Sequence, residues 1–159
     1  MLNTRNIVNA SMIGCILYLL YISFSNILYL ELVTFGLLVF SRLVVKKELI
    51  YGSVVFGLLI ILLKGFFVWN VMYIVVIFAY SCLFTTLEIK DKYIPLFGGF
   101  CSFMIGIFLD LPFMIFGEYA CIAYALSSFK VSIIQGVLTG LILFFAYEKI
   151  IHLLRKAVK

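Results

Sequence analysis

Aromatic and polar side chains suited to binding a small molecule recur near the ends of the apolar stretches of this chain. Trp69 and Tyr73 are four residues apart, so on a helix they share a face with the adjacent Asn70. A small-molecule site needs aromatic walls with a few placed polar groups. Two alternatives stay open, an interfacial aromatic belt for Trp69 and Tyr73 and an interhelical hydrogen bond for Gln135. The residues that we expect to contact a ligand are Glu31, Trp69, Asn70, Tyr73, Glu118, Tyr124 and Gln135.

Residues suited to catalysis or metal binding are scarce. The one histidine, His152, lies in a charged segment near the C-terminus, and nothing matches the nucleotide-binding P-loop. The four cysteines stand singly in apolar runs, where cysteine often packs as a small buried hydrophobe. The seven acidic residues all fall near the ends of predicted helices. We therefore expect no enzyme activity, no catalytic residue, no cofactor and no metal site.

The elements that must position these side chains are six apolar stretches. With 66% hydrophobic and 12% charged residues, the chain is far from the composition of soluble proteins. A membrane-spanning helix needs about 20 residues, or fewer where other protein covers it. We predict an all-α integral membrane protein, a single transmembrane domain of six helices over residues 1–159. The stretches are roughly 7–25, 28–44, 49–63, 67–87, 93–115 and 131–151.

The basic residues predict the orientation of this bundle. If the six stretches cross in turn, ten of the twelve Lys and Arg residues fall on one side, and only Lys64 and Lys130 fall on the other. Short cytoplasmic loops carry the excess of Lys and Arg, so both termini should lie in the cytoplasm. The net charge of +5 then reflects topology and contact with the lipid bilayer, not nucleic-acid binding.

The segment between residues 110 and 130 is apolar enough to resemble another span. It contains Asp110, Pro112 and Glu118, which are costly at membrane depth. A seventh crossing would also place the basic C-terminus outside, against the charge rule. We predict instead that helix five has a kinked end, followed by an outer-leaflet or re-entrant segment at about 112–129. Such backbone is tolerated where protein covers it or where it lines a cavity.

Small residues recur at four-residue spacing in the first helix. Ala10 and Gly14 share one helix face, which would let another helix approach closely. This pair could serve packing within the bundle. It could also form a docking groove for a partner membrane protein, and Ala10 and Gly14 are our candidate docking residues.

On these features the whole chain resembles the substrate-binding S component of an energy-coupling-factor (ECF) vitamin transporter. The shared plan is six helices, both ends inside, and small residues at four-residue spacing in helix one. Locally, the run Glu31-Leu-Val-Thr-Phe35, the basic segment 42–47, and Gly65 followed by Trp69-Asn-Val-Met-Tyr73 are similar to one branch of the family. So is the stretch from Ala123-Tyr124 to Gln135-Gly136. That branch has aspartate, histidine and asparagine where this chain has Ser132, Gln135 and Thr139.

The resemblance implies a function and partners. An S component of the bacterial plasma membrane captures a vitamin or vitamin precursor from outside. It then docks on a transmembrane T component coupled to two cytoplasmic ATPases, whose ATP hydrolysis drives substrate release inside. Substrate import of this kind is our first functional hypothesis.

The alternative is a rod-shape-determining MreD-like membrane scaffold. The stretch from Phe103 to Leu111, with Asp110 near its end, and the run Gly117-x-Tyr119-Ala120 are similar to a stretch of that family. That stretch lies nearer the start of the chain in MreD-like proteins, whereas here only one clear helix follows it. Such a protein would bind cell-shape machinery and not a vitamin.

Overall fold

The computed structural model describes residues 3–24, 27 and 30–157, and within them the protein is helical and contains no strand. The all-α class and the order of six α-helices are confirmed. Four helical segments are long and apolar enough to cross a membrane: Thr4–Phe24, Val68–Thr86, Asp91–Phe116 and Glu118–Lys156. The helices are α1 (Thr4–Phe24), α2 (Val33–Ser41), α3 (Lys46–Lys64), α4 (Val68–Thr86), α5 (Ile94–Asp110) and α6 (Glu118–Ala157), with 3-10 turns η1 (Asp91–Tyr93) and η2 (Leu111–Phe116).

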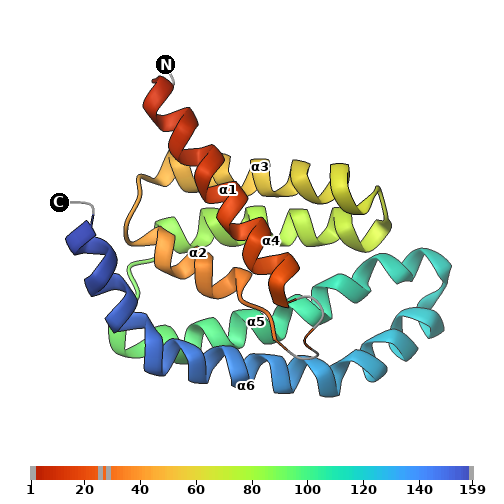
Figure 1. Cartoon of the computed structure of the whole chain (residues 1–159). Coiled ribbons are helices and arrows are strands. Elements are labelled where there is room, and N and C mark those ends of the chain that lie inside the picture. The colour runs from red at the N-terminus through yellow and green to blue at the C-terminus, as the bar shows by residue number, and fades with distance from the viewer. Residues whose placement is uncertain (1–2, 25–26, 28–29, 158–159) are drawn as a thin grey trace.

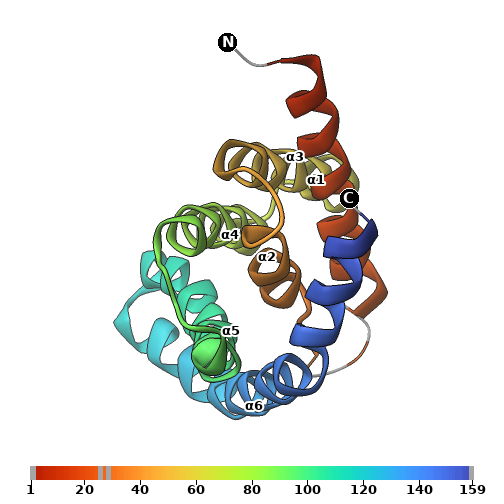
Figure 2. The same ribbon diagram turned by 90° about the vertical axis from the view of Figure 1, so that its left-hand side faces the viewer.

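The short helix α2 lies at the centre of the bundle. It contacts α1, α3, α4, α5 and α6, and Figure 2 shows it enclosed by them. Its nine residues are apolar on nearly every side, and a helix of that kind is stable only when it is buried. Accordingly Val33, Leu37 and Leu38 are almost fully buried. Our prediction of a helix over 28–44 was too long, because the described helix begins at Val33; residues 28 and 29 lie outside the description.

The two ends of the bundle differ in charge. In Figure 1 both chain termini, the α2–α3 connection and the α4–α5 connection lie at one end, and the α3–α4 and α5–α6 connections lie at the other. The first end therefore collects the segments rich in Lys and Arg, as the charge pattern predicted. Lys64, at the end of α3, belongs to the opposite end.

The last helix begins earlier than we predicted. Helix α5 ends at Asp110 and is followed by η2, but residues 118–129 are the first turns of α6, which continues without a break for 40 residues. Residues 118–129 are therefore part of the last helix and not a separate segment, whereas the position of residues 112–129 at the outer leaflet stays a prediction. Gly117 has φ 111°, a conformation that suits glycine, and it reverses the chain directly after η2. Ser128 donates a hydrogen bond to the buried carboxylate of Asp110, which ties this part of α6 to the end of α5.

Close helix contacts depend on small residues. A Cβ atom on Gly14 would lie 2.7 Å from Val55 Cβ on α3, and Ala10 is buried. Ala10 and Gly14 therefore pack α1 against α3 within the chain. A partner could reach them only if α1 moved away from α3, and their role in docking stays a prediction. On the other side of the bundle, Gly99 of α5 and Gly136 of α6 bring the two backbones equally close.

Candidate functional site

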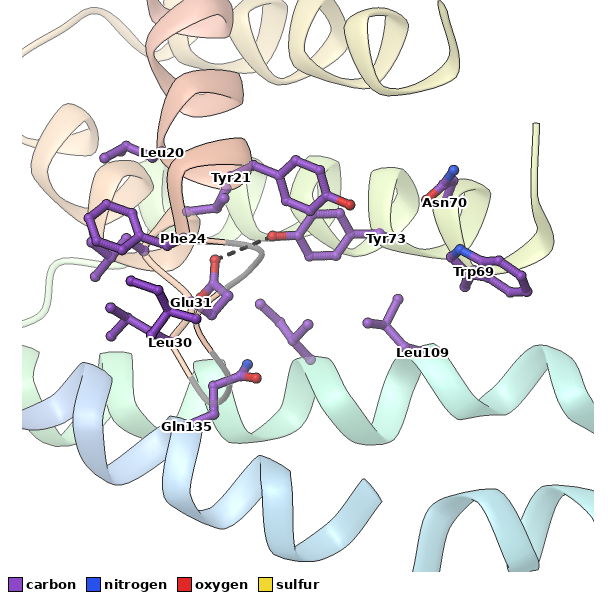
Figure 3. Close-up of a pocket in the computed structure, with 14 residues that line it drawn as sticks. Leu20, Tyr21, Phe24, Leu30, Glu31, Trp69, Asn70, Tyr73, Leu109 and Gln135 are labelled. Atoms are coloured by element: carbon purple, nitrogen blue, oxygen red, sulfur yellow. Dashed lines mark hydrogen bonds between the residues drawn. The ribbon is translucent and has the colours of Figure 1, made fainter. Parts of the chain in front are cut away.

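A pocket of about 260 Å³ lies between the end of α1, the segment before α2, the start of α4, α5 and α6 (Figure 3). It combines one carboxylate and two amides with aromatic and aliphatic side chains. Five of the seven residues predicted to contact a ligand line it, namely Glu31, Trp69, Asn70, Tyr73 and Gln135. The other lining residues are Leu20, Tyr21, Phe24, Ile27, Leu30, Leu32, Val33, Ile105 and Leu109.

Glu31 sits in front of the first turn of α2. Its Oε1 accepts hydrogen bonds from the backbone N–H of Thr34, at 2.9 Å, and from the hydroxyl of Tyr73, at 3.3 Å. The first N–H groups of a helix have no partner within the helix, and they carry partial positive charge. Glu31, the residue before the N-cap Leu32, therefore satisfies one free N–H of α2 and is also a wall of the pocket.

A chain of hydrogen bonds joins Glu31 to α5 and α6. Gln135 Nε2 donates to the backbone carbonyl of Ser102, at 3.0 Å, and approaches Ser102 Oγ at 3.4 Å. Ser102 Oγ in turn donates to Glu31 Oε2 at 3.4 Å. Thr139 Oγ1 donates to the backbone carbonyl of Glu31 at 3.1 Å and lies 3.0 Å from Ser102 Oγ. Polar groups buried among apolar helices need such partners. The network therefore fixes the position and the orientation of the Glu31 carboxylate.

Aromatic rings form the wall opposite this network. The ring of Tyr21 lies 5.5 Å from that of Tyr73, and both rings contact Phe56 behind them. Figure 3 shows the Tyr73 hydroxyl directed at Glu31 and the Tyr21 ring beside Tyr73. The phenol thus presents its hydroxyl to the acid and its ring to the cavity. The rings are rigid and apolar, and they offer flat faces for a ligand to stack on.

Trp69 and Asn70 lie at the start of α4, away from Glu31 (Figure 3). Trp69 is half exposed and stacks on Phe67, with ring centroids 5.0 Å apart. Asn70 is buried, and its Nδ2 donates to the carbonyl of Gly65 at 2.9 Å. This bond closes the turn between α3 and α4, and no other described residue makes a hydrogen bond to the asparagine oxygen.

Two of the predicted ligand contacts lie outside this pocket. Glu118 is exposed at the first residue of α6. Tyr124 stacks on Phe113 of η2, with ring centroids 4.1 Å apart. We expected residues 112–129 to form a segment of their own before the last helix. Because residues 118–129 are instead the start of α6, Glu118 and Tyr124 lie on the α5–α6 hairpin.

Two side chains of the site and its network, Tyr21 and Ser102, were not predicted from the sequence, and Thr139 was noted only as a departure from the family pattern. Tyr21 lines the cavity, and Ser102 and Thr139 hold Glu31 in place. Ser102 and Thr139 are completely buried hydroxyls within long apolar helices. The signal that could have found Ser102 is its position three residues after the close-packing Gly99, since small residues mark the side of α5 that faces another helix.

The described part of the chain contains no group of three or more His, Cys, Asp or Glu side chains placed to hold a metal ion. The lining of the pocket consists of hydrogen-bonding and stacking groups, and it includes no His or Cys. What the arrangement can do chemically is bind and orient a ligand. Comparison with protein-family models, with curated proteins and with solved structures finds no match to this chain.

Proposed function

We propose that this protein is the membrane-embedded substrate-capture subunit of an ECF-type importer for a vitamin or vitamin precursor. The observation that carries the proposal is the pocket around Glu31. It converges from five segments of the bundle, has an acid held by a hydrogen-bond network, and has aromatic walls. A scaffold protein has no need to keep such a cavity open among its helices, whereas a binding protein does.

The proposed topology is six membrane crossings with both termini in the cytoplasm. The short α2 crosses with the help of its flanking segments, because its neighbours cover it on all sides. Trp69 and Asn70 begin α4 at the end of the bundle opposite the two termini. The pocket would then face the outside of the cell, where a scarce substrate has to be captured.

Import also needs a source of energy. Because the sequence has no P-loop, two cytoplasmic ATPases would hydrolyse the ATP. A transmembrane T component would couple these ATPases to this chain. These are partners, and the chain contributes the ligand site alone.

The experiment is a binding screen followed by an uptake assay. The purified protein is screened by thermal shift against B vitamins, their precursors and nucleobases, and each compound that stabilises it is measured by calorimetry on wild type and on Gln135→Leu. The control is Leu141→Ala, at an exposed side chain of the same helix that lies outside the pocket lining. Cells expressing the chain with a T component and two ATPases should take up the same compound.

The expected result is one compound class that binds the wild type, binds Gln135→Leu at least several-fold more weakly, and accumulates in cells only with the ATPases. The proposal is wrong if no compound binds and the protein instead co-purifies with cell-shape proteins, which is the outcome expected of the MreD-like alternative.

A further inference from the structure

We propose that the pocket selects a small organic cation, with the carboxylate of Glu31 as its counter-charge. The ligand class is a protonated amine, or a comparable cationic nitrogen that carries N–H groups, on an aromatic or apolar frame. This inference rests on the proposed function and names the substrate class of the same site.

The charge of the pocket comes from one side chain. Among its 14 lining residues, Glu31 is the only one that carries a charge. The two basic residues of this end of the bundle, Lys64 and Lys130, are exposed and do not line the cavity. Residues 25, 26, 28 and 29 lie outside the described structure, and none of them is Lys or Arg in the sequence. When Glu31 is ionised, the pocket therefore has a negative charge with no basic side chain among its lining residues to neutralise it.

The donors around Glu31 oppose the cost of burying its charge, a cost that by itself favours the neutral acid. Three donors point at the carboxylate, from Thr34 N–H, Tyr73 Oη and Ser102 Oγ. Hydrogen bonds donated to a carboxylate stabilise the charged state, and so does the positive end of a helix. These neutral donors hold the charge in place without cancelling it. In the low dielectric of an apolar bundle, a cation placed beside it gains more than it would in water.

Two hydrogen-bond acceptors near Glu31 have capacity left for a ligand. A carboxylate offers about four acceptor positions, of which the three donors take three. They leave one on Oε2, which has a single donor. The amide of Gln135 uses its nitrogen on Ser102, and within the described residues no hydrogen bond uses its carbonyl oxygen. A ligand that fills these two acceptor positions must bring donors. The nearby hydroxyl of Thr34, which has no hydrogen-bond partner within the described residues, can donate or accept.

The pocket is small and has aromatic walls. A cavity of about 260 Å³ is small for a ligand site, and the phenol rings of Tyr21 and Tyr73 flank the acid. Electron-rich faces attract a cation within about 6 Å of the ring centre. A compact cation with one flat apolar part would meet the carboxylate and an aromatic face together.

The experiment compares probes that share a shape and differ in charge. Tryptamine is a cation, tryptophol replaces its ammonium group by a hydroxyl, and indole-3-acetate is an anion. Thermal shift and calorimetry are run with the purified full-length protein, as wild type and as Glu31→Gln. Asp110→Asn is the matched control, since Asp110 is the other acid at this end that is buried and hydrogen-bonded, and it lies outside the pocket lining.

We expect tryptamine to bind the wild type at least ten-fold more tightly than tryptophol does, and indole-3-acetate to bind least. Glu31→Gln should remove the preference for the cation, and Asp110→Asn should keep it. The amide can still accept from Thr34 and Tyr73 and can donate to Ser102, so the variant keeps all three contacts. Since an unpaired buried charge costs stability, the ligand-free Glu31→Gln protein should also melt at a higher temperature than wild type.

The inference is overturned if tryptophol or indole-3-acetate binds as well as tryptamine, or if the cation preference survives in Glu31→Gln. A Glu31→Gln protein that fails to fold or melts at a lower temperature also overturns it, because the carboxylate would then be part of the scaffold. Tight binding of a neutral or anionic vitamin at a site weakened by Gln135→Leu would overturn the charge selection and leave the capture function intact. If neither these probes nor the vitamin panel binds, both proposals fail.

Discussion

Replacing Gly99 by alanine should destabilise the protein and loosen the site at the same time. The new Cβ atom would lie 2.7 Å from the carbonyl oxygen of Gly136 and 3.3 Å from Gly140 Cα. Both neighbours are backbone atoms of α6, which cannot rotate away as a side chain can. Since ordinary contact begins at 3.4 Å, the two backbones would have to separate by about 0.7 Å at this point.

That separation reaches the pocket because the network is built on the same two helices. Gln135, next to Gly136, donates to the carbonyl of Ser102 at 3.0 Å. If α5 and α6 part by the same amount there, this distance grows to about 3.7 Å, beyond hydrogen-bonding range. Overpacking a close contact costs about 1–3 kcal/mol. We expect Gly99→Ala to lower the free energy of unfolding by that amount and to weaken ligand binding several-fold.

The assay uses the protein's own buried thiols. Cys101 and Cys121 are buried, so a maleimide dye reacts with them only on unfolding, in a background where Cys15 and Cys82 are serine. Ala79→Leu on α4 is the control, because this alanine is exposed and a larger side chain there meets no helix. A Gly99→Ala protein that melts like wild type and binds ligand equally well would refute the close α5–α6 contact and its link to the site.

Three further predictions follow from the same contacts. Trp69→Ala should cost about 1 kcal/mol or more of ligand binding by removing a stacking face, which calorimetry measures, while Tyr119→Ala, at a side chain 89% exposed, should leave the affinity unchanged. Gly14→Leu should lower the melting temperature of the isolated protein, because its side chain meets Val55 of α3; an unchanged melting temperature with weaker T-component pull-down would instead support docking at this face. Tags at the two chain ends should both report cytoplasm and Tyr119→Cys should be labelled from outside, and a C-terminus found outside would contradict the six-crossing topology.

Hydropathy predicted the long helices well because each is a continuous apolar run between charged or glycine-containing connections. It failed at the two places where an apolar run is not simply a span. Before α2, the side chain of Glu31 satisfies one free N–H of the helix, and hydropathy has no means of seeing such a contact. The second place is residues 118–129, where Asp110 and Glu118 argued against a span. Asp110 accepts a hydrogen bond from Ser128, and Glu118 is exposed at the start of a helix.

The site was predictable only in part for a related reason. Trp69, Asn70 and Tyr73 could be grouped because one helix carries them at known spacing. Their meeting with Glu31 and Gln135 depends on how three helices are rotated against one another, and a single sequence does not state those angles. The lone hydroxyl of Ser102 gave no signal, since serine and threonine are common in apolar helices and bond to their own backbone. Thr139 was marked only by its place in the family resemblance.

The brevity of α2 has a consequence for how the chain would enter a membrane in the proposed topology. Nine helical residues rise only about 14 Å, well short of the roughly 30 Å of hydrocarbon that a helix must cross by itself. As it leaves the ribosome, this segment has no α4, α5 or α6 around it, and α2 would expose unpaired backbone groups to lipid. It therefore has to wait at the interface beside α1 and settle only when the later helices arrive. Chains truncated after α4 should hold this segment loosely and be degraded quickly, so the pocket around Glu31 should be the last part of the molecule to be completed.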